Sequence, residues 1–170
     1  IHNSDIDNRG DARTQTISSY ITDDNGVTYD LVTYQALTNR EFNSDHNVTN
    51  QATLTYDQQG GTLLDVTETR STGFHSSGVA LHQVVATFAD EAKSSLIDVK
   101  TIDNSDISLL GYVGSSTVTR YSGLTGYDGS GGELIPDEAT KVDQQVIKTT
   151  AFDVRGNAMK QEIVKSYYDP

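Results

Sequence analysis

The sequence predicts an all-β protein built from successive antiparallel hairpins. Three observations support this prediction. Apolar and polar side chains alternate over short runs, clusters of Asp, Asn and Gly separate these runs, and several segments of the chain resemble one another. Alternation with a period of two is typical of half-buried strands, and Asp, Asn and Gly favour the tight turns that join strands. We expect the hairpins to stack side by side into an elongated sheet or a solenoid.

The composition favours a thin core and excludes several kinds of partner. Only 35% of the 170 residues are hydrophobic, which is less than compact globular domains usually contain. Twelve Lys and Arg against 24 Asp and Glu give a net charge of -12, and such a chain repels nucleic acid and anionic lipid surfaces. We therefore expect no nucleic-acid partner and no membrane insertion. Because the chain has no Cys, disulfides and thiolate chemistry are excluded.

The residue usage also bears on localisation and completeness. Abundant Thr, Ser, Asn, Asp and Gly, with few Lys, resembles bacterial secreted and cell-surface β-proteins. We therefore expect an extracellular or cell-surface location. The chain begins at Ile1 without a recognisable leader, and its last residues, Tyr-Tyr-Asp-Pro, stop where a new turn would begin. We interpret residues 1–170 as a single β-repeat region and as a segment of a longer array.

Two kinds of internal repeat can be aligned. Residues 1–17 and 147–163 share seven identities without a gap, and a third copy from Ile102 keeps Gly111 at the place of Gly10. Residues 42–56 and 74–88 form a second kind of unit, with matching Phe, Ser, Gln and Thr positions and a length of about 32 residues. The predicted repeats therefore start near residues 1, 42, 74, 102 and 147.

The expected strands lie between the turn signals. In residues 47–56, Val48, Ala52, Leu54 and Tyr56 share one face, and in residues 141–152 the same parity joins Val142, Val146 and Phe152. The Asp, Asn and Gly clusters predict five turns, at residues 24–26, 57–61, 103–104, 128–132 and 153–157.

One segment also fits a helix. Apolar residues between 81 and 96 recur at helical spacing, and "ADEAKSS" has a composition that a helix accepts. The corresponding segment at 47–56 is rich in Thr and Asn, which are poor helix formers. Because homologous repeats share a fold, we predict a strand, with a short helix or 3₁₀ turn near residues 90–94 as the alternative.

Four short stretches, "TYDQQGG", "GYDGSGG", "AFDVRGN" and the terminal "YYDP", carry an aromatic residue followed by Asp. The pattern aromatic-Asp-x-x-Gly resembles the tyrosine-aspartate (YD, or Rhs-type) repeats of large secreted bacterial proteins. The resemblance implies stacked hairpins in which the Asp and Gly form the turn and the aromatic residue packs between strands. It implies such structural roles for Tyr56, Asp57, Gly60, Tyr127, Asp128, Gly131, Phe152, Asp153 and Gly156.

Candidate ligand sites are few, and no residue qualifies as catalytic. The four His residues show no HExxH or other paired-ligand spacing. Asp5, Asp7 and Asp11 offer hard oxygen donors that Ca²⁺ prefers, although Arg9 stands where an EF-hand loop would have another oxygen donor. Bound Ca²⁺ therefore remains an open alternative, and we expect no other cofactor.

The tripeptide Arg9-Gly10-Asp11, a known integrin ligand in some extracellular proteins, becomes Arg-Gly-Asn at residues 155–157. What recurs is a Gly and a turn-forming side chain, so we assign Asp7 and Gly10 to a turn.

These observations predict a non-enzymatic structural protein. Open strand edges are expected to pair with copies of the same chain or with neighbouring repeats, giving filaments or a cell-surface layer. Two alternatives stay open: an adhesin-like β-sandwich that binds glycan or protein, and a carbohydrate-active enzyme on a β-scaffold.

Overall fold

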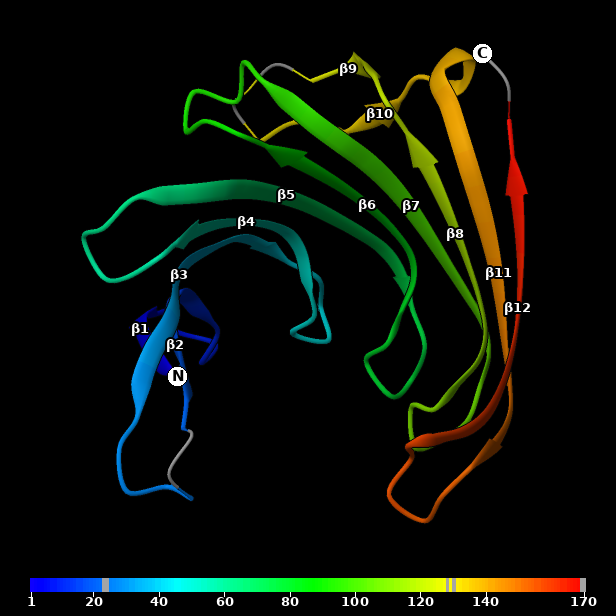
Figure 1. The fold of residues 1–170 in the computed structure, drawn as a ribbon, viewed down its shortest axis with the longest axis horizontal. Helices are drawn as coiled ribbons and strands as arrows, with labels where there is room; N and C mark the ends of the chain where they lie inside the picture. Colours follow the sequence, from blue (N-terminus) through cyan, green and yellow to red (C-terminus); the bar gives the residue numbers. More distant parts are fainter. Residues whose placement is uncertain (23–24, 128, 130, 169–170) are drawn as a thin grey trace. The chain divides into compact units, whose positions relative to one another are not determined.

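The structure is a computed structural model that describes residues 1–22, 25–127, 129 and 131–168. It is an antiparallel all-β protein, as predicted, and its described residues contain no α-helix (Figure 1). The strands are β1 (His2–Ile6), β2 (Ala12–Ile21), β3 (Asp30–Phe42), β4 (Val48–Tyr56), β5 (Leu63–Phe74), β6 (Ala80–Phe88), β7 (Leu96–Ile107), β8 (Val113–Tyr121), β9 (Leu124–Gly126), β10 (Ile135–Pro136), β11 (Lys141–Phe152) and β12 (Ala158–Tyr167).

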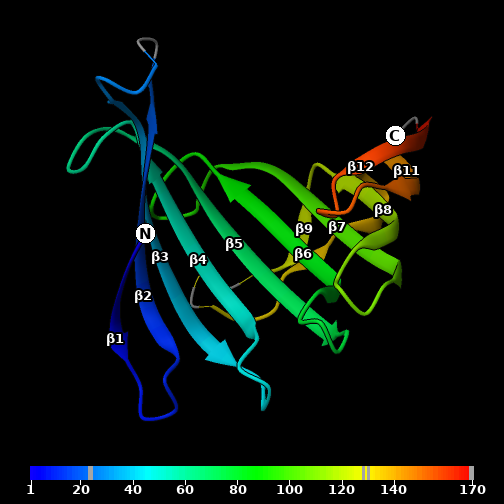
Figure 2. The same ribbon diagram turned by 90° about the horizontal axis from the view of Figure 1, so that it is seen from below.

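The strands follow one another in chain order. Ten of them form one sheet in the order β1-β2-β3-β4-β5-β6-β7-β8-β11-β12, while β9 and β10 pair separately between β8 and β11 (Figure 2). The described strand pairings, including that of β9 with β10, are antiparallel. Because every connection in the large sheet joins neighbouring strands, it is a meander of hairpins.

The chain divides into two compact units. The first contains residues 1–68 and 87–96, and the second contains residues 69–86 and 97–170. Ala52, Val66 and Phe88 are buried in the first unit, and Val99 and Leu134 are among the buried residues of the second. Among the described residues, nine hydrophobic and nine polar or charged residues are buried, so half of the buried residues are polar or charged.

The ambiguous segment at 81–96 is a strand followed by a turn. Strand β6 buries Ala80, Val84, Ala86 and Phe88, while Leu81 between them is exposed. Residues 89–95 form turns and bends without a helix. The strand prediction is confirmed, and the helical spacing arises because the other face of β6 also carries apolar side chains.

Residues 48–56 form strand β4, but the predicted apolar face is only partly buried: Ala52 is 3% exposed and Asn50 beside it on that face is 5% exposed, while Val48, Leu54 and Tyr56 are half-buried. In the β3–β4 pairing, Leu54 lies opposite Ala36 and Tyr56 opposite Tyr34. The two tyrosine rings lie 6.4 Å apart between centroids and are tilted, a separation at which aromatic pairs are favourable.

The predicted apolar face of residues 141–152 is wrong in one respect. The deeply buried residue of β11 is Asp143, at 4% exposure, whereas Val142 and Val146 are only half-buried. Asp143 tolerates burial because Arg120 lies 2.7 Å and Lys165 3.6 Å from its Oδ2. A buried charge needs such partners.

The turn predicted at Asp103 and Asn104 is also wrong, because both residues lie inside β7. Their side chains point into cross-strand contacts: Asp103 Oδ1 lies 2.6 Å from His82 Nδ1, and Asn104 Nδ2 donates to the carbonyl oxygen of Ala80 at 3.0 Å. The turn follows instead at residues 108–112.

The other predicted turns differ in how far the structure describes them. Asn25 and Gly26 have positive φ, as turn residues often do, while Asp24 and Asp128 lie outside the described residues. The only described 3₁₀ turn is η1 (Glu138–Thr140), which the sequence does not predict and which Asp137 caps by accepting from the N–H of Ala139.

A pair of glycine substitutions separates backbone strain from packing. Gly10 and Gly156 have φ of +90° and +85°; a Cβ at Gly10 would meet nothing within 4 Å, whereas one at Gly156 would clash with the ring of Tyr112. We expect Gly10→Ala to cost about 1 kcal/mol from left-handed strain alone, and Gly156→Ala to cost at least about 1 kcal/mol more. Urea unfolding followed by circular dichroism measures both; equal losses would contradict the packing of Tyr112 on Gly156.

Candidate functional site

Five hairpin turns have the same backbone hydrogen bonds. In each five-residue turn the N–H of the first residue donates to the carbonyl of the fifth, and the N–H of the fourth donates to the carbonyl of the first, at 2.8 to 3.3 Å. The turns span residues 7–11, 43–47, 75–79, 108–112 and 153–157. The fourth residue has φ between 65° and 90° in all five. This is a type I turn followed by a residue in the left-handed region.

The side chain of the first residue fastens each turn. Asp7 Oδ1 accepts from the N–H groups of Arg9 and Asp11 at 2.8 and 3.0 Å. Asn43 and Asp153 likewise accept from the N–H groups of the third and fifth residues of their turns. His75 and Ser108 accept one such bond each. The turn therefore accepts several side chains that can take a hydrogen bond from the backbone.

The hydrogen bonds change the acidity of the turn aspartates. The N–H of Asp11 is the main cause that lowers the pKa of Asp7, and the side chain of Asn157 is the main cause that lowers the pKa of Asp153. Donors that favour the charged carboxylate make it a stronger acid.

A different turn occurs after β4 and β6. Asp57 Oδ1 accepts from the N–H of Thr62, and Asp90 Oδ2 accepts from the N–H of Ser95, both at 2.7 Å and five residues away. The fourth residues, Gly60 and Lys93, again have positive φ. The N–H of Ser94 is the main cause that lowers the pKa of Asp90.

The aromatic-Asp motifs thus fall in two kinds of turn. The Asp57 carboxylate accepts from the N–H of the residue five positions later, whereas the Asp153 carboxylate accepts from the N–H groups of the residues two and four positions later. Tyr56 packs on Tyr34, and Phe152 packs on Tyr112 with centroids 5.4 Å apart. Tyr127 and Gly131 lie near the β9–β10 pair, and Asp128 is outside the described residues.

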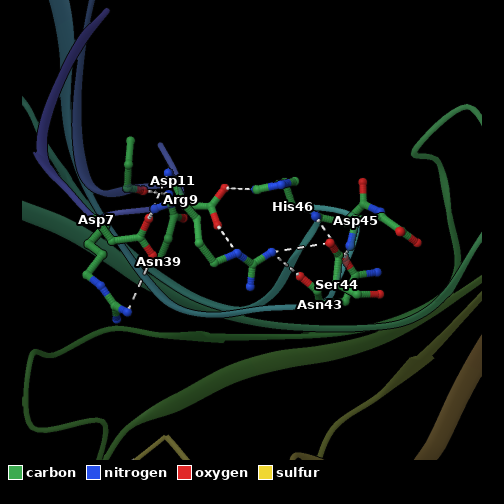
Figure 3. Close-up of polar contacts among 11 residues, drawn as sticks. Asp7, Arg9, Asp11, Asn39, Asn43, Ser44, Asp45 and His46 are labelled. Carbon is green, nitrogen blue, oxygen red and sulfur yellow. Dashed lines mark hydrogen bonds and ion pairs between the residues drawn. The ribbon is translucent and has the colours of Figure 1, made fainter.

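The first two turns are joined by the tripeptide Arg9-Gly10-Asp11 (Figure 3). The guanidinium of Arg9 donates to the carbonyls of Asn43 and Ser44 at 2.9 and 3.3 Å, and Asp11 Oδ1 lies 2.8 Å from His46 Nδ1. Asp11 is only 7% exposed. Its carboxylate is part of the contact between two turns rather than part of a displayed loop.

Cross-strand polar pairs accompany the turns. We count positions from the first residue of each turn, so that Asn3 is position -4 and Gln15 is position +8 of the first hairpin. Gln15 Nε2 donates to Asn3 Oδ1 at 2.8 Å. The same two positions are hydrogen-bonded in three further hairpins, as the pairs Asn39 and Gln51, Ser71 and Gln83, and Thr149 and Gln161.

The Asn at position -4 also joins neighbouring hairpins. Asn39, 3% exposed, donates through Nδ2 to the carbonyl of Ala12 at 2.7 Å. Asn104 donates in the same way to Ala80 at 3.0 Å. Ala12 and Ala80 both stand at position +5 of the preceding hairpin. Asn39 also accepts from Gln51, and a buried amide bonded on both sides resists displacement of one hairpin along the next.

The sequence does not reveal the ion pairs that become buried. In the first unit Glu68 is fully buried and takes a bidentate contact from Arg40, at 2.6 and 2.8 Å, and a 2.6 Å contact from Lys93. These residues lie far apart along the chain, so only the folded register brings them together.

The predicted calcium ligands are engaged elsewhere. Asp7 fastens its turn, Asp11 faces His46, and Asp5 is exposed. Within the described residues no group of three or more His, Asp or Glu side chains is placed to hold a metal ion. His75 bonds Ser77 in its own turn, and His82 bonds Asp103.

One polar cavity of about 420 Å³ lies beside the first turn. It is lined by Asp7, Asn8, Arg9, Arg13, Arg40, Glu41 and Phe42. Its three arginines face acidic partners: Arg9 lies 3.7 Å from Asp11, Arg13 lies 3.7 Å from Asp7, and Arg40 holds Glu68. The cavity therefore has little uncompensated charge.

The terminal strands present the most exposed surface of the large sheet. All five residues of β1 and all ten of β12 are exposed, and each strand stands at an end of the strand order with one neighbour. In β12, Met159, Ile163 and Tyr167 are 71%, 58% and 74% exposed. An end strand keeps one row of backbone donors and acceptors available for pairing.

No family model, curated protein or solved structure matches this chain. The described residues include no helix that is long and apolar enough to cross a membrane.

The turn aspartates predict a loss of stability in acid. Their pKa values lie below the ordinary 3.8 in the folded chain, so they stabilise the fold above that pH and lose their effect as the pH falls through the lower, folded values. We expect the free energy of unfolding to fall less below pH 3.8 when Asp7, Asp90 and Asp153 are all changed to Asn. Urea unfolding at several pH values measures this; Asp45→Asn is the control, because the Asp45 carboxylate makes none of these bonds. Parallel pH curves for the triple variant and the wild type would refute the assignment.

Proposed function

We propose that this chain is a non-enzymatic structural repeat module whose hairpins stack side by side and whose terminal strands pair with further copies or neighbouring repeats. The observation that carries the proposal is the fivefold recurrence of one turn with matching strands on both sides. The turns begin at residues 7, 43, 75, 108 and 153, so that successive turns lie 36, 32, 33 and 45 residues apart. The longest interval contains β9, β10 and η1.

The recurrence supports one repeated unit rather than two kinds. The residue before the turn is Ile or Phe in all five hairpins, and position +5 is Ala or Val. Ile6 faces Ala12, Phe42 faces Val48, and the last two hairpins have the same pairing. A unit that buries its faces mainly on its neighbours is suited to extension by addition of further units.

Exposed end strands supply the means of assembly. Strand β12 exposes Met159, Ile163 and Tyr167, and Lys160, Glu162 and Lys165 stand between them. Lys residues on an edge strand oppose pairing, but β12 contains no Pro and no described segment covers its outer edge. Pairing of these strands with another chain would satisfy their backbone groups and cover the apolar side chains.

The setting that we propose is the bacterial cell surface or the extracellular matrix. A chain with no Cys, with a net charge of -12 and with abundant Thr, Ser, Asn and Gly remains compatible with an oxidising, aqueous environment. The resemblance to tyrosine-aspartate repeats belongs to this proposal, and it rests on the motifs at Asp57 and Asp153.

Assembly of the purified chain tests the function. We expect the sedimentation coefficient to rise with protein concentration and negative-stain images to show filaments or sheets. Ile163→Lys places a charge on β12 and should raise the concentration needed for assembly by about ten-fold. Leu109→Lys is the matched control, because Leu109 is an exposed apolar residue in a turn, at 86% exposure.

A monomer at every concentration would contradict the structural function. Equal inhibition by Ile163→Lys and Leu109→Lys would show that net charge, rather than the β12 strand, controls assembly.

A further inference from the structure

Adjacent hairpins within the chain meet in one fixed register. Between β2 and β3, Gln15 lies opposite Leu37 and Thr14 opposite Thr38. Between β8 and β11, Ser116 lies opposite Ile147 and Ser115 opposite Lys148. In both cases position +8 of one hairpin faces position -6 of the next, and position +7 faces position -5. The first interface lies in one compact unit and the second lies in the other. The same register therefore occurs twice in the chain, in separate places.

The same positions are covered inside the chain and open at its ends. Leu37 and Ile147, at position -6, are half-buried, whereas Ile1 at position -6 of the first hairpin is 88% exposed. Gln15 at position +8 is half-buried, whereas Gln161 of the last hairpin is exposed. Within the described residues, no hairpin covers these two terminal positions.

The Asn at position -4 shows the same difference. Asn39 and Asn104 each donate to the carbonyl at position +5 of the preceding hairpin. Asn3 occupies this position in the first hairpin; its Oδ1 accepts from Gln15, while its Nδ2 donates to no acceptor in the described part of the chain. The carbonyl of Ala158 is the position +5 acceptor of the last hairpin.

We propose that a second copy of this chain joins the first through β12 and β1, in the register that the internal hairpins already use. Gln161 of one copy then lies opposite Ile1 of the next, Lys160 lies opposite His2, and the Asn3 amide donates to the carbonyl of Ala158. This inference rests on the proposed structural function and specifies its interface. The pairing is head to tail, so it repeats from one copy to the next and gives an open filament unless the rotation between copies closes a ring.

The interface uses interactions that the chain already makes. Ile1 is covered as Leu37 is, the Asn3 amide is bonded as those of Asn39 and Asn104 are, and the free backbone groups of two strands are paired. A shift of the pairing by one residue would place Ile1 and Asn3 on the other face of the sheet, away from these contacts. The side chains of Ile1 and Asn3 therefore help to specify which residues of the two strands lie opposite each other.

Cysteine cross-linking tests the register, because the chain has no Cys of its own. One batch carries His2→Cys and a second carries Lys160→Cys; a parallel pair carries Ile1→Cys and Gln161→Cys. Neighbouring pairs in an antiparallel ladder alternate between a wide and a narrow type, so one of the two pairs should have the Cβ separation that a disulfide needs. The control mixture joins His2→Cys with Gln161→Cys, which face opposite sides of the sheet in the proposed register.

Two mixtures place the cysteines opposite each other: His2→Cys with Lys160→Cys, and Ile1→Cys with Gln161→Cys. Under assembling conditions and mild oxidation, we expect at least one of them to give about ten-fold more disulfide-linked dimer than the control mixture, because its thiols are held at high effective concentration. Assembly without this excess would overturn the register while leaving edge pairing itself intact. Absence of assembly in the wild-type chain would overturn both the proposed function and this interface.

Discussion

The five-residue hairpin turn is the constraint on which the rest of the structure depends. A type I turn followed by a left-handed residue allows one pairing of the flanking strands. That pairing decides which side chains share a face, because a slip of one residue would exchange the two faces of a strand. The buried contacts of Asn39, Asp143 and Glu68 all exist only in that register.

Polar contacts hold much of the interior, because half of the buried residues that the structure describes are polar or charged. A buried amide or carboxylate costs free energy unless it is bonded, and two buried side chains, Asn39 and Glu68, are bonded on more than one side. Asn39 bonds Ala12 and Gln51, and Glu68 bonds Arg40 and Lys93. Polar contacts of this kind are directional, so they select one register where a thin apolar core would accept several. This explains how a chain with 35% hydrophobic residues maintains a ten-stranded sheet.

The sequence predicts the class of the fold well because alternation and turn residues are local signals. It correctly favours a strand for 80–88, where repeat comparison outweighs helical spacing. It fails at Asp103 and Asn104, which have the composition of a turn but use their side chains to bond His82 and Ala80 across strands. A local pattern does not distinguish these two uses of Asp and Asn.

The common turn is hidden from the sequence for a related reason. His46 replaces Gly in the second turn, and Asn43, His75 and Ser108 replace Asp at the first position. The backbone geometry tolerates these exchanges, so the alignments assign hairpins with one turn geometry to two kinds of repeat. The partners of Glu68 cannot be predicted either, because Arg40 and Lys93 meet it only after β3 and β5 are placed.

Amide hydrogen exchange at several protein concentrations tests the central claim most directly. If the chain assembles through its end strands, exchange in residues 1–6 and 158–167 should slow as the concentration rises, while exchange within β4 stays the same. Residues 108–112 and 153–157 lie in turns rather than on a free edge and serve as internal references. Slowing confined to the turns, with the end strands exchanging equally fast at every concentration, would contradict assembly by strand pairing.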